Sequence, residues 1–149
     1  MSIDEWYRNG WLEQHQTSPQ EIQEQLLGAD QDLRDAEGDI SPGWQFAISY
    51  NAALRLGTVL LYASGFRAVR QQRHYRTIAA MELILGREHE GLAIFLDRCR
   101  SKRSEVTYES VQVVAPSEVK ELKEAVRELR RLIHDWLSAH HPEYLSSER

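Results

Sequence analysis

The sequence has little cysteine, proline or glycine: its 149 residues include one cysteine, 4 prolines and 8 glycines. The lone Cys99 excludes a disulfide within the chain. The scarcity of proline and glycine excludes collagen-like, low-complexity and many-turned β-sandwich chains. The first residues also lack the basic start, apolar run and cleavage site of a secretory leader. We therefore expect one all-α domain in the cytoplasm.

Charge is distributed unevenly along the chain, although the net charge is only -5. Residues 1–43 hold ten acidic and two basic side chains, whereas residues 44–110 hold ten basic and six acidic ones. The overall negative charge excludes indiscriminate binding to nucleic acid. A phosphate-bearing partner is still expected at the basic middle segment.

Apolar residues at spacings of three and four predict a bundle of about five helices. The periodic runs cover residues 19–37, 44–66, 74–85, 92–103 and 118–141. The predicted layout is a single domain, 1–149, with a docking segment at 1–17 that includes a short helix, a bundle at 18–140 and a tail at 141–149. The stretch 106–114 is interpreted as a helix end and loop, since a lone strand would have no partner.

Three serines predict helix starts. Ser18, followed by Pro19 and Glu21, forms an S-x-x-E capping box, Ser41 repeats the signal, and Ser117 is the predicted N-cap of the last helix.

The second run is apolar on nearly every side, yet it carries Asn51 and Arg55. A charge in the middle of the run excludes a membrane span and predicts a central bundle helix. Asn51 and Arg55 share one face, because they are four residues apart. We expect them to make a polar contact, with Glu82 as the partner, in preference to lining an inward cavity.

A basic stretch is the most specific local feature. Arg98, Arg100, Lys102 and Arg103 fall within six residues, and Tyr108 follows five residues after Arg103. Guanidinium groups bind phosphate in a bidentate manner, and a phenol donates a hydrogen bond or stacks on a base. The alternative is a solvated helix end whose cations complement the helix dipole.

A second basic cluster, at the junction of two predicted helices, contains Arg67, Arg70, Arg73, His74 and Arg76. An unperturbed histidine titrates near pH 6.5, so His74 could act as an acid or base beside phosphate. The alternative is a histidine that only begins a helix.

Other chemistry has little support. His134, His140 and His141 lack the spacing and cysteine partners of a zinc site, so no metal is expected. The sequence has no glycine-rich phosphate loop, so no cofactor is expected.

Three segments resemble the HEPN superfamily over residues 18–140: 44–54, 65–67 with 74–78, and 103–108. The resemblance implies an antiparallel helical bundle that forms a homodimer, with two motifs facing one cleft. It also implies metal-independent RNA cleavage by toxins that pair with a nucleotidyltransferase. Arg103 and Ser104 match the motif, and Tyr108 stands where histidine is usual, so the implied catalytic residues are Arg103 and Tyr108. A phenol remains protonated at neutral pH and acts as a donor.

We therefore expect an RNA- or nucleotide-binding domain of a toxin-antitoxin type. Arg103 would hold a phosphate and Tyr108 would donate to it or stack on a base. The other expected phosphate-binding residues are Arg98, Arg100, Lys102 and His74. Two alternatives remain: a metal-independent ribonuclease, and a protein-interaction module using the acidic N-terminal segment with Trp6 and Trp11.

Overall fold

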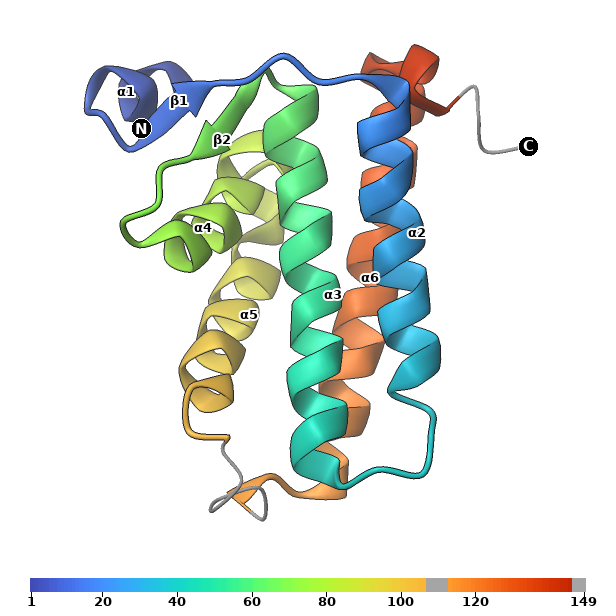
Figure 1. Cartoon of the computed structure of the whole chain (residues 1–149). Coiled ribbons are helices and arrows are strands. Elements are labelled where there is room, and N and C mark those ends of the chain that lie inside the picture. The colour runs from blue at the N-terminus through green and yellow to red at the C-terminus, as the bar shows by residue number, and fades with distance from the viewer. Residues whose placement is uncertain (107–112, 146–149) are drawn as a thin grey trace.

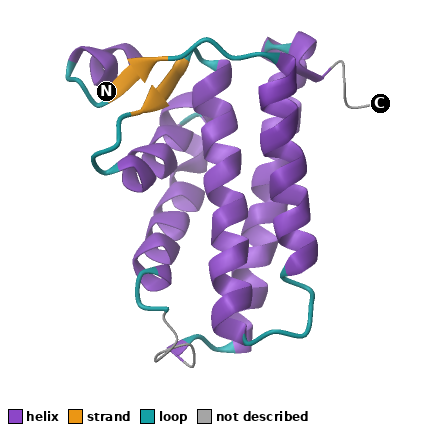
Figure 2. Ribbon diagram, in the orientation of Figure 1, coloured by secondary structure: helices purple, strands orange, loops and turns teal. Residues whose placement is uncertain are grey.

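The computed structural model describes residues 1–106 and 113–145 as an all-α helical bundle, which confirms the predicted fold class (Figures 1 and 2). The α-helices are α1 (Ile3–Arg8), α2 (Pro19–Asp35), α3 (Pro42–Ala63), α4 (Arg73–Leu85), α5 (Glu90–Arg103) and α6 (Pro116–His140). The short elements are β1 (Leu12–Gln14), β2 (Phe66–Ala68) and the 3₁₀ turns η1 (Arg87–His89) and η3 (Pro142–Leu145).

Helix α3 is the centre of the bundle, as its apolar sequence predicts. It packs against α2 and α6 on one side and against α4 and α5 on the other (Figure 1). Most of its residues are buried, from Phe46 to Ala63. None of the helices in residues 1–106 and 113–145 combines the length and apolar character needed to cross a bilayer.

The core is built from the apolar stripes of the long helices. Its fully buried members include Ile22 and Leu26 of α2, Leu56 and Leu60 of α3, Ile78 of α4, Leu96 of α5, and Leu122, Leu129 and Ile133 of α6. A smaller cluster forms around Trp6, Leu12, Leu61 and Ala68, where the N-terminal segment docks on the bundle.

Two of the three predicted caps are confirmed. The side chains of Ser18 and Ser41 accept hydrogen bonds from the backbone N–H groups of Glu21 and Trp44. The prediction for Ser117 is wrong, because α6 begins earlier and Ala115 is its N-cap. The Glu118 carboxylate accepts a hydrogen bond from the Ala115 N–H at 2.9 Å, so this backbone donor at the start of α6 has a partner.

A two-stranded antiparallel sheet, which the sequence did not predict, joins the docking segment to the chain after α3. Strand β1 pairs with β2 in the register Leu12↔Ala68. Gly10 and Gly65 adopt positive φ angles of 80° and 92°, which end α1 and α3 just before the strands. The N-terminal segment is thereby joined to the chain between α3 and α4.

The polar face of α3 contacts α2, so the predicted partner Glu82 is wrong. Asn51 Nδ2 and Arg55 Nε both donate to Asp32 Oδ2, at 2.9 and 3.1 Å. Gly28 of α2 leaves room for this contact, because a Cβ there would lie 2.7 Å from the Arg55 guanidinium.

Residues 107–112 of the predicted helix end and loop lie outside the described residues. Val106, just before them, and Val114, two residues after them, are both buried in the core.

Candidate anion-binding site

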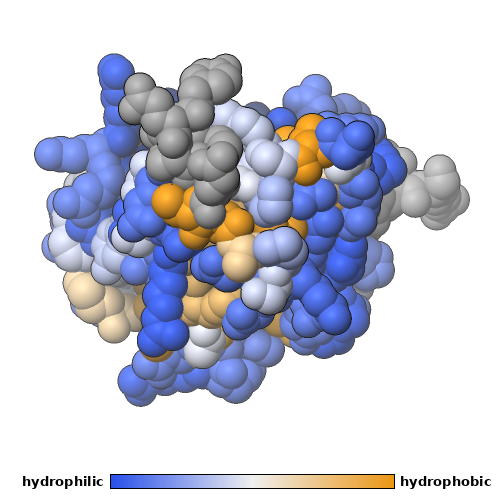
Figure 3. Space-filling view, turned by 90° about the horizontal axis from the view of Figure 1, so that it is seen from below, coloured by the Kyte–Doolittle hydropathy of each residue, from blue (hydrophilic) through white to orange (hydrophobic). Residues whose placement is uncertain are grey.

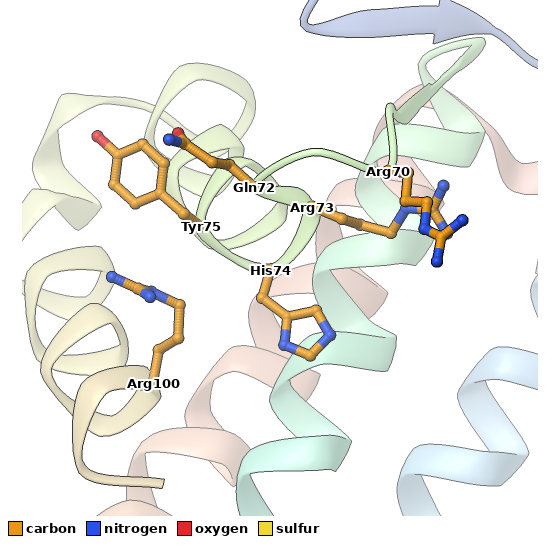
Figure 4. Close-up of a pocket in the computed structure, with 6 residues that line it drawn as sticks. All are labelled: Arg70, Gln72, Arg73, His74, Tyr75 and Arg100. Atoms are coloured by element: carbon orange, nitrogen blue, oxygen red, sulfur yellow. The ribbon is translucent and has the colours of Figure 1, made fainter. Parts of the chain in front are cut away.

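A hollow of about 700 Å³ lies where α4 begins and α5 ends (Figure 4). We call it the arginine hollow. Its lining residues are Arg70, Gln72, Arg73, His74, Tyr75 and Arg100. Three of the six are arginines, and none is acidic. The hollow therefore has the charge and the size of a site for an anionic small molecule or part of a polyanion.

The chain before α4 holds one wall of the hollow. The Val69 N–H donates to the Trp11 carbonyl at 3.1 Å, and the Arg73 Nε donates to the Ala68 carbonyl at 3.1 Å. Gln72, the N-cap residue of α4, makes no side-chain cap. The positive end of the α4 dipole is therefore next to the hollow without a side-chain acceptor.

Arg100 closes the opposite wall from α5. Its Nε donates to Asp97 Oδ1 at 2.8 Å, and its guanidinium carbon lies 5.6 Å from the centre of the Tyr75 ring. Across the hollow, Arg70 is exposed and forms no ion pair with the described residues. In Figure 4, Arg70 and Arg73 extend toward the α3 side, Arg100 comes from α5, and His74 projects between the two groups.

Tyr50 lies beneath His74, with the two ring centres 6.4 Å apart. The Tyr50 side chain is buried, and its hydroxyl has no hydrogen-bond partner among the described residues. Burial raises the pKa of Tyr50 to about 12. Burial, followed by the charges of Arg103, Arg100 and Arg73, lowers the pKa of His74. His74 is therefore a neutral imidazole at pH 7, while Tyr50 keeps its proton.

The residues predicted to bind phosphate are distributed over two sides of α5. Arg100 lines the arginine hollow together with His74. Arg103 is exposed on the last turn of α5, close enough to affect the pKa values of His74 and Tyr50. By contrast, Lys102 and Arg98 line a different hollow, and Lys102 lies 3.7 Å from Glu118. Tyr108 lies outside the described residues.

That second hollow has a volume of about 310 Å³ and a lining of both apolar and charged residues. Phe46, Phe95 and Cys99 form its apolar part, and the hollow is bordered by charged residues of α5 and α6. Seen from the end at which α6 begins, apolar surface lies within a mainly hydrophilic face (Figure 3). Burial raises the pKa of Cys99 to about 12, so its thiol is neither a nucleophile nor a ready metal ligand.

Two lining residues, Gln72 and Tyr75, were not singled out from the sequence as site residues. No local pattern marks them, because their position in the hollow depends on α5 lying beside the start of α4. The fold does bring together the two basic clusters that the sequence shows separately, by placing Arg70, Arg73 and His74 opposite Arg100.

The two N-terminal tryptophans pack against the bundle. Trp6 is buried, and Trp11 lies beneath Arg76, whose guanidinium carbon is 3.7 Å from the ring centre. Their rings thus contribute to docking the N-terminal segment.

Comparisons of the chain with protein-family models, with curated proteins and with solved structures give no match.

Proposed function

We propose that the protein binds RNA or a nucleotide through the arginine hollow. The observation that carries the proposal is the composition of the lining: three arginines and a histidine from α4, α5 and the loop before α4, with no acidic member. A guanidinium donates paired hydrogen bonds that match phosphate oxygens, and an anion at this position would compensate the charge of Arg70.

Two neighbouring features support the same ligand. The start of α4 presents backbone N–H groups and the positive end of a helix dipole, which favour phosphate. Arg103, exposed on the last turn of α5, adds a cation close to His74. An RNA ligand also fits the cytoplasmic location expected from the sequence.

The proposal includes the HEPN-like assignment. It is supported by the sequence resemblance of residues 18–140. A homodimer and a nucleotidyltransferase-type partner, as in a toxin-antitoxin pair, belong to the same proposal.

The test is a titration of labelled single-stranded RNA at several salt concentrations, followed by fluorescence anisotropy. We expect Arg70→Ala, Arg100→Ala and Arg103→Ala each to weaken binding. Each phosphate contact that is lost should reduce the slope of log affinity against log salt by about 0.7.

Arg87→Ala is the matched control, because Arg87 is an exposed arginine next to the opposite ends of α4 and α5. It removes the same charge and should leave the salt slope unchanged. Unchanged affinity and slope in Arg70→Ala, Arg100→Ala and Arg103→Ala would contradict the proposal.

A metal-independent ribonuclease is the second candidate, favoured by the state of His74. A neutral imidazole among arginines is the form that accepts a proton as a general base. The phenol of Tyr108 would supply the acid. Cleavage of mixed RNA in chelator, lost in His74→Gln and in Tyr108→Phe, would support this activity, whereas intact RNA would favour binding alone.

A further inference from the structure

Tyr75 presents an aromatic ring to solvent at the edge of the arginine hollow. The residue is 40% exposed. The guanidinium carbons of Arg76 and Arg100 both lie 5.6 Å from its centre. No other aromatic ring among the described residues packs on it. The ring therefore has two cations beside it and keeps part of its surface open to solvent.

Gln72 lies next to this ring in the lining and in the close-up view (Figure 4). It is the one non-glycine residue of the described chain with a positive φ angle, 57°, a conformation that side-chain-bearing residues seldom adopt. Its amide makes no cap hydrogen bond to α4. An amide carries both donors and an acceptor, which match the mixed edge of a nucleobase.

We propose that the arginine hollow takes an unpaired nucleotide, whose base stacks on Tyr75 and hydrogen-bonds to Gln72 while its phosphate meets the arginines. This inference rests on the proposed function and narrows its ligand to unpaired nucleotides. The volume of about 700 Å³ accommodates a base and sugar in addition to a phosphate.

The chemistry of the lining favours this ligand over two simpler ones. A phosphate group alone would use the arginines and leave the ring and the amide without a role. Duplex RNA would offer phosphates, but its bases are already stacked on one another and cannot reach a ring in a hollow. Stacking on aromatic side chains is the usual way in which proteins hold unpaired bases.

The experiment compares four probes: a single-stranded RNA of about eight nucleotides, an abasic phosphodiester of the same length, the matching duplex, and adenosine monophosphate. We expect the single strand to bind more tightly than the abasic strand and the duplex. Tyr75→Ala should weaken binding of the single strand by about 5- to 150-fold, the range that corresponds to losing one stacked base. The same variant should change the affinity for the abasic strand by no more than about twofold.

Tyr7→Ala is the matched control, because Tyr7 is also 40% exposed but lies on α1 and outside the lining. Tyr75→Phe keeps a ring and should bind as the wild type does. A second readout is the fluorescence of 2-aminopurine placed in the strand, which stacking quenches. The quenching should persist in Tyr75→Phe and disappear in Tyr75→Ala.

The outcomes separate this inference from the function on which it rests. If single and abasic strands bind equally, or Tyr75→Ala keeps the difference between them, base stacking is overturned while phosphate binding stands. If no probe responds to Arg70→Ala, Arg100→Ala or Arg103→Ala, both proposals fail. Adenosine monophosphate binding as tightly as the strand would identify a free nucleotide as the ligand, and weaker binding would identify an RNA strand; either result supports an unpaired base.

Discussion

The ring of His74 lies 6.4 Å from the ring of Tyr50, and the arginines at the end of α5 act on both. A neutral imidazole that lines the arginine hollow thus lies close to a buried phenol. The imidazole gives the hollow a response to pH that the exposed arginines alone would not have.

Acidification is expected to destabilise the protein through His74. Its pKa is lowered in the folded state, so the unfolded chain binds the proton more readily. Stability is therefore highest above the unfolded value of about 6.5 and falls as the pH drops below it. His74→Gln should remove this component. Urea midpoints measured from pH 7.5 downward, for wild type and variant, provide the check; parallel curves would contradict the assignment.

The affinity for an anionic ligand should rise on acidification, in contrast to the stability of the free protein. An anion next to His74 favours its protonated form, so the affinity for single-stranded RNA should rise as the pH falls through the pKa of the bound state. Isothermal titrations in buffers of different ionisation enthalpy would detect proton uptake. An equal rise in His74→Gln would show that another group is responsible.

Removal of the Tyr50 hydroxyl is expected to leave the stability of the ligand-free protein unchanged or to raise it by up to about 1 kcal/mol. The reason is that a buried hydroxyl without a partner carries a desolvation cost that Tyr50→Phe removes. Tyr50→Ala, which empties the same site, should instead cost about 3–5 kcal/mol. Chemical denaturation measures both. A marked loss of stability in Tyr50→Phe would reveal a hydrogen bond to that hydroxyl.

Replacing Gly57 with a larger residue is expected to destabilise the protein, because α4 packs directly on this glycine. A Cβ at this position would lie 2.9 Å from the Thr77 side chain and 3.1 Å from the Thr77 carbonyl. Gly57→Ala should therefore cost about 1–3 kcal/mol. Gly91→Ala is the control: this glycine of α5 has open space around it, and the change should stabilise by up to about 1 kcal/mol. Thermal melting of both variants checks the contrast.

The Asp32–Arg55 contact is expected to give a coupling free energy of about 0.5–1 kcal/mol in a double-mutant cycle, because both groups retain some solvent. The coupling should weaken at high salt. The same cycle between Glu82 and Arg55 should give a value near zero. A larger coupling to Glu82 would contradict the observed pairing.

The long helices were predictable because their apolar spacing and their serine caps act locally. Ser18 and Ser41 mark real starts, and the apolar run after Ser41 is the centre of the bundle. At α6 the serine did not mark the start, because the cap is the hydrogen bond that the Ala115 N–H donates to the Glu118 carboxylate, and alanine has no capping side chain.

The small sheet and the candidate site depend on contacts between distant residues. Strands of three residues, such as β1, are too short to show alternation in the sequence. The basic clusters were visible in the sequence, yet only the packing of α5 beside α4 shows that Arg100 lines the same hollow as Arg73 and that Lys102 does not. Tyr75 acquires its position for the same reason.

The pairing of β1 with β2 has a consequence for the loop that carries Arg70. Strand β1 pairs with β2, and the Trp11 carbonyl accepts the Val69 N–H, so the N-terminal segment fixes the backbone just before that loop. It thereby stabilises one wall of the hollow. A protein that lacks residues 1–14 would keep its long helices, but the ordering of that wall would then have to accompany ligand binding. The N-terminal segment thus preorganises a binding site that it does not line.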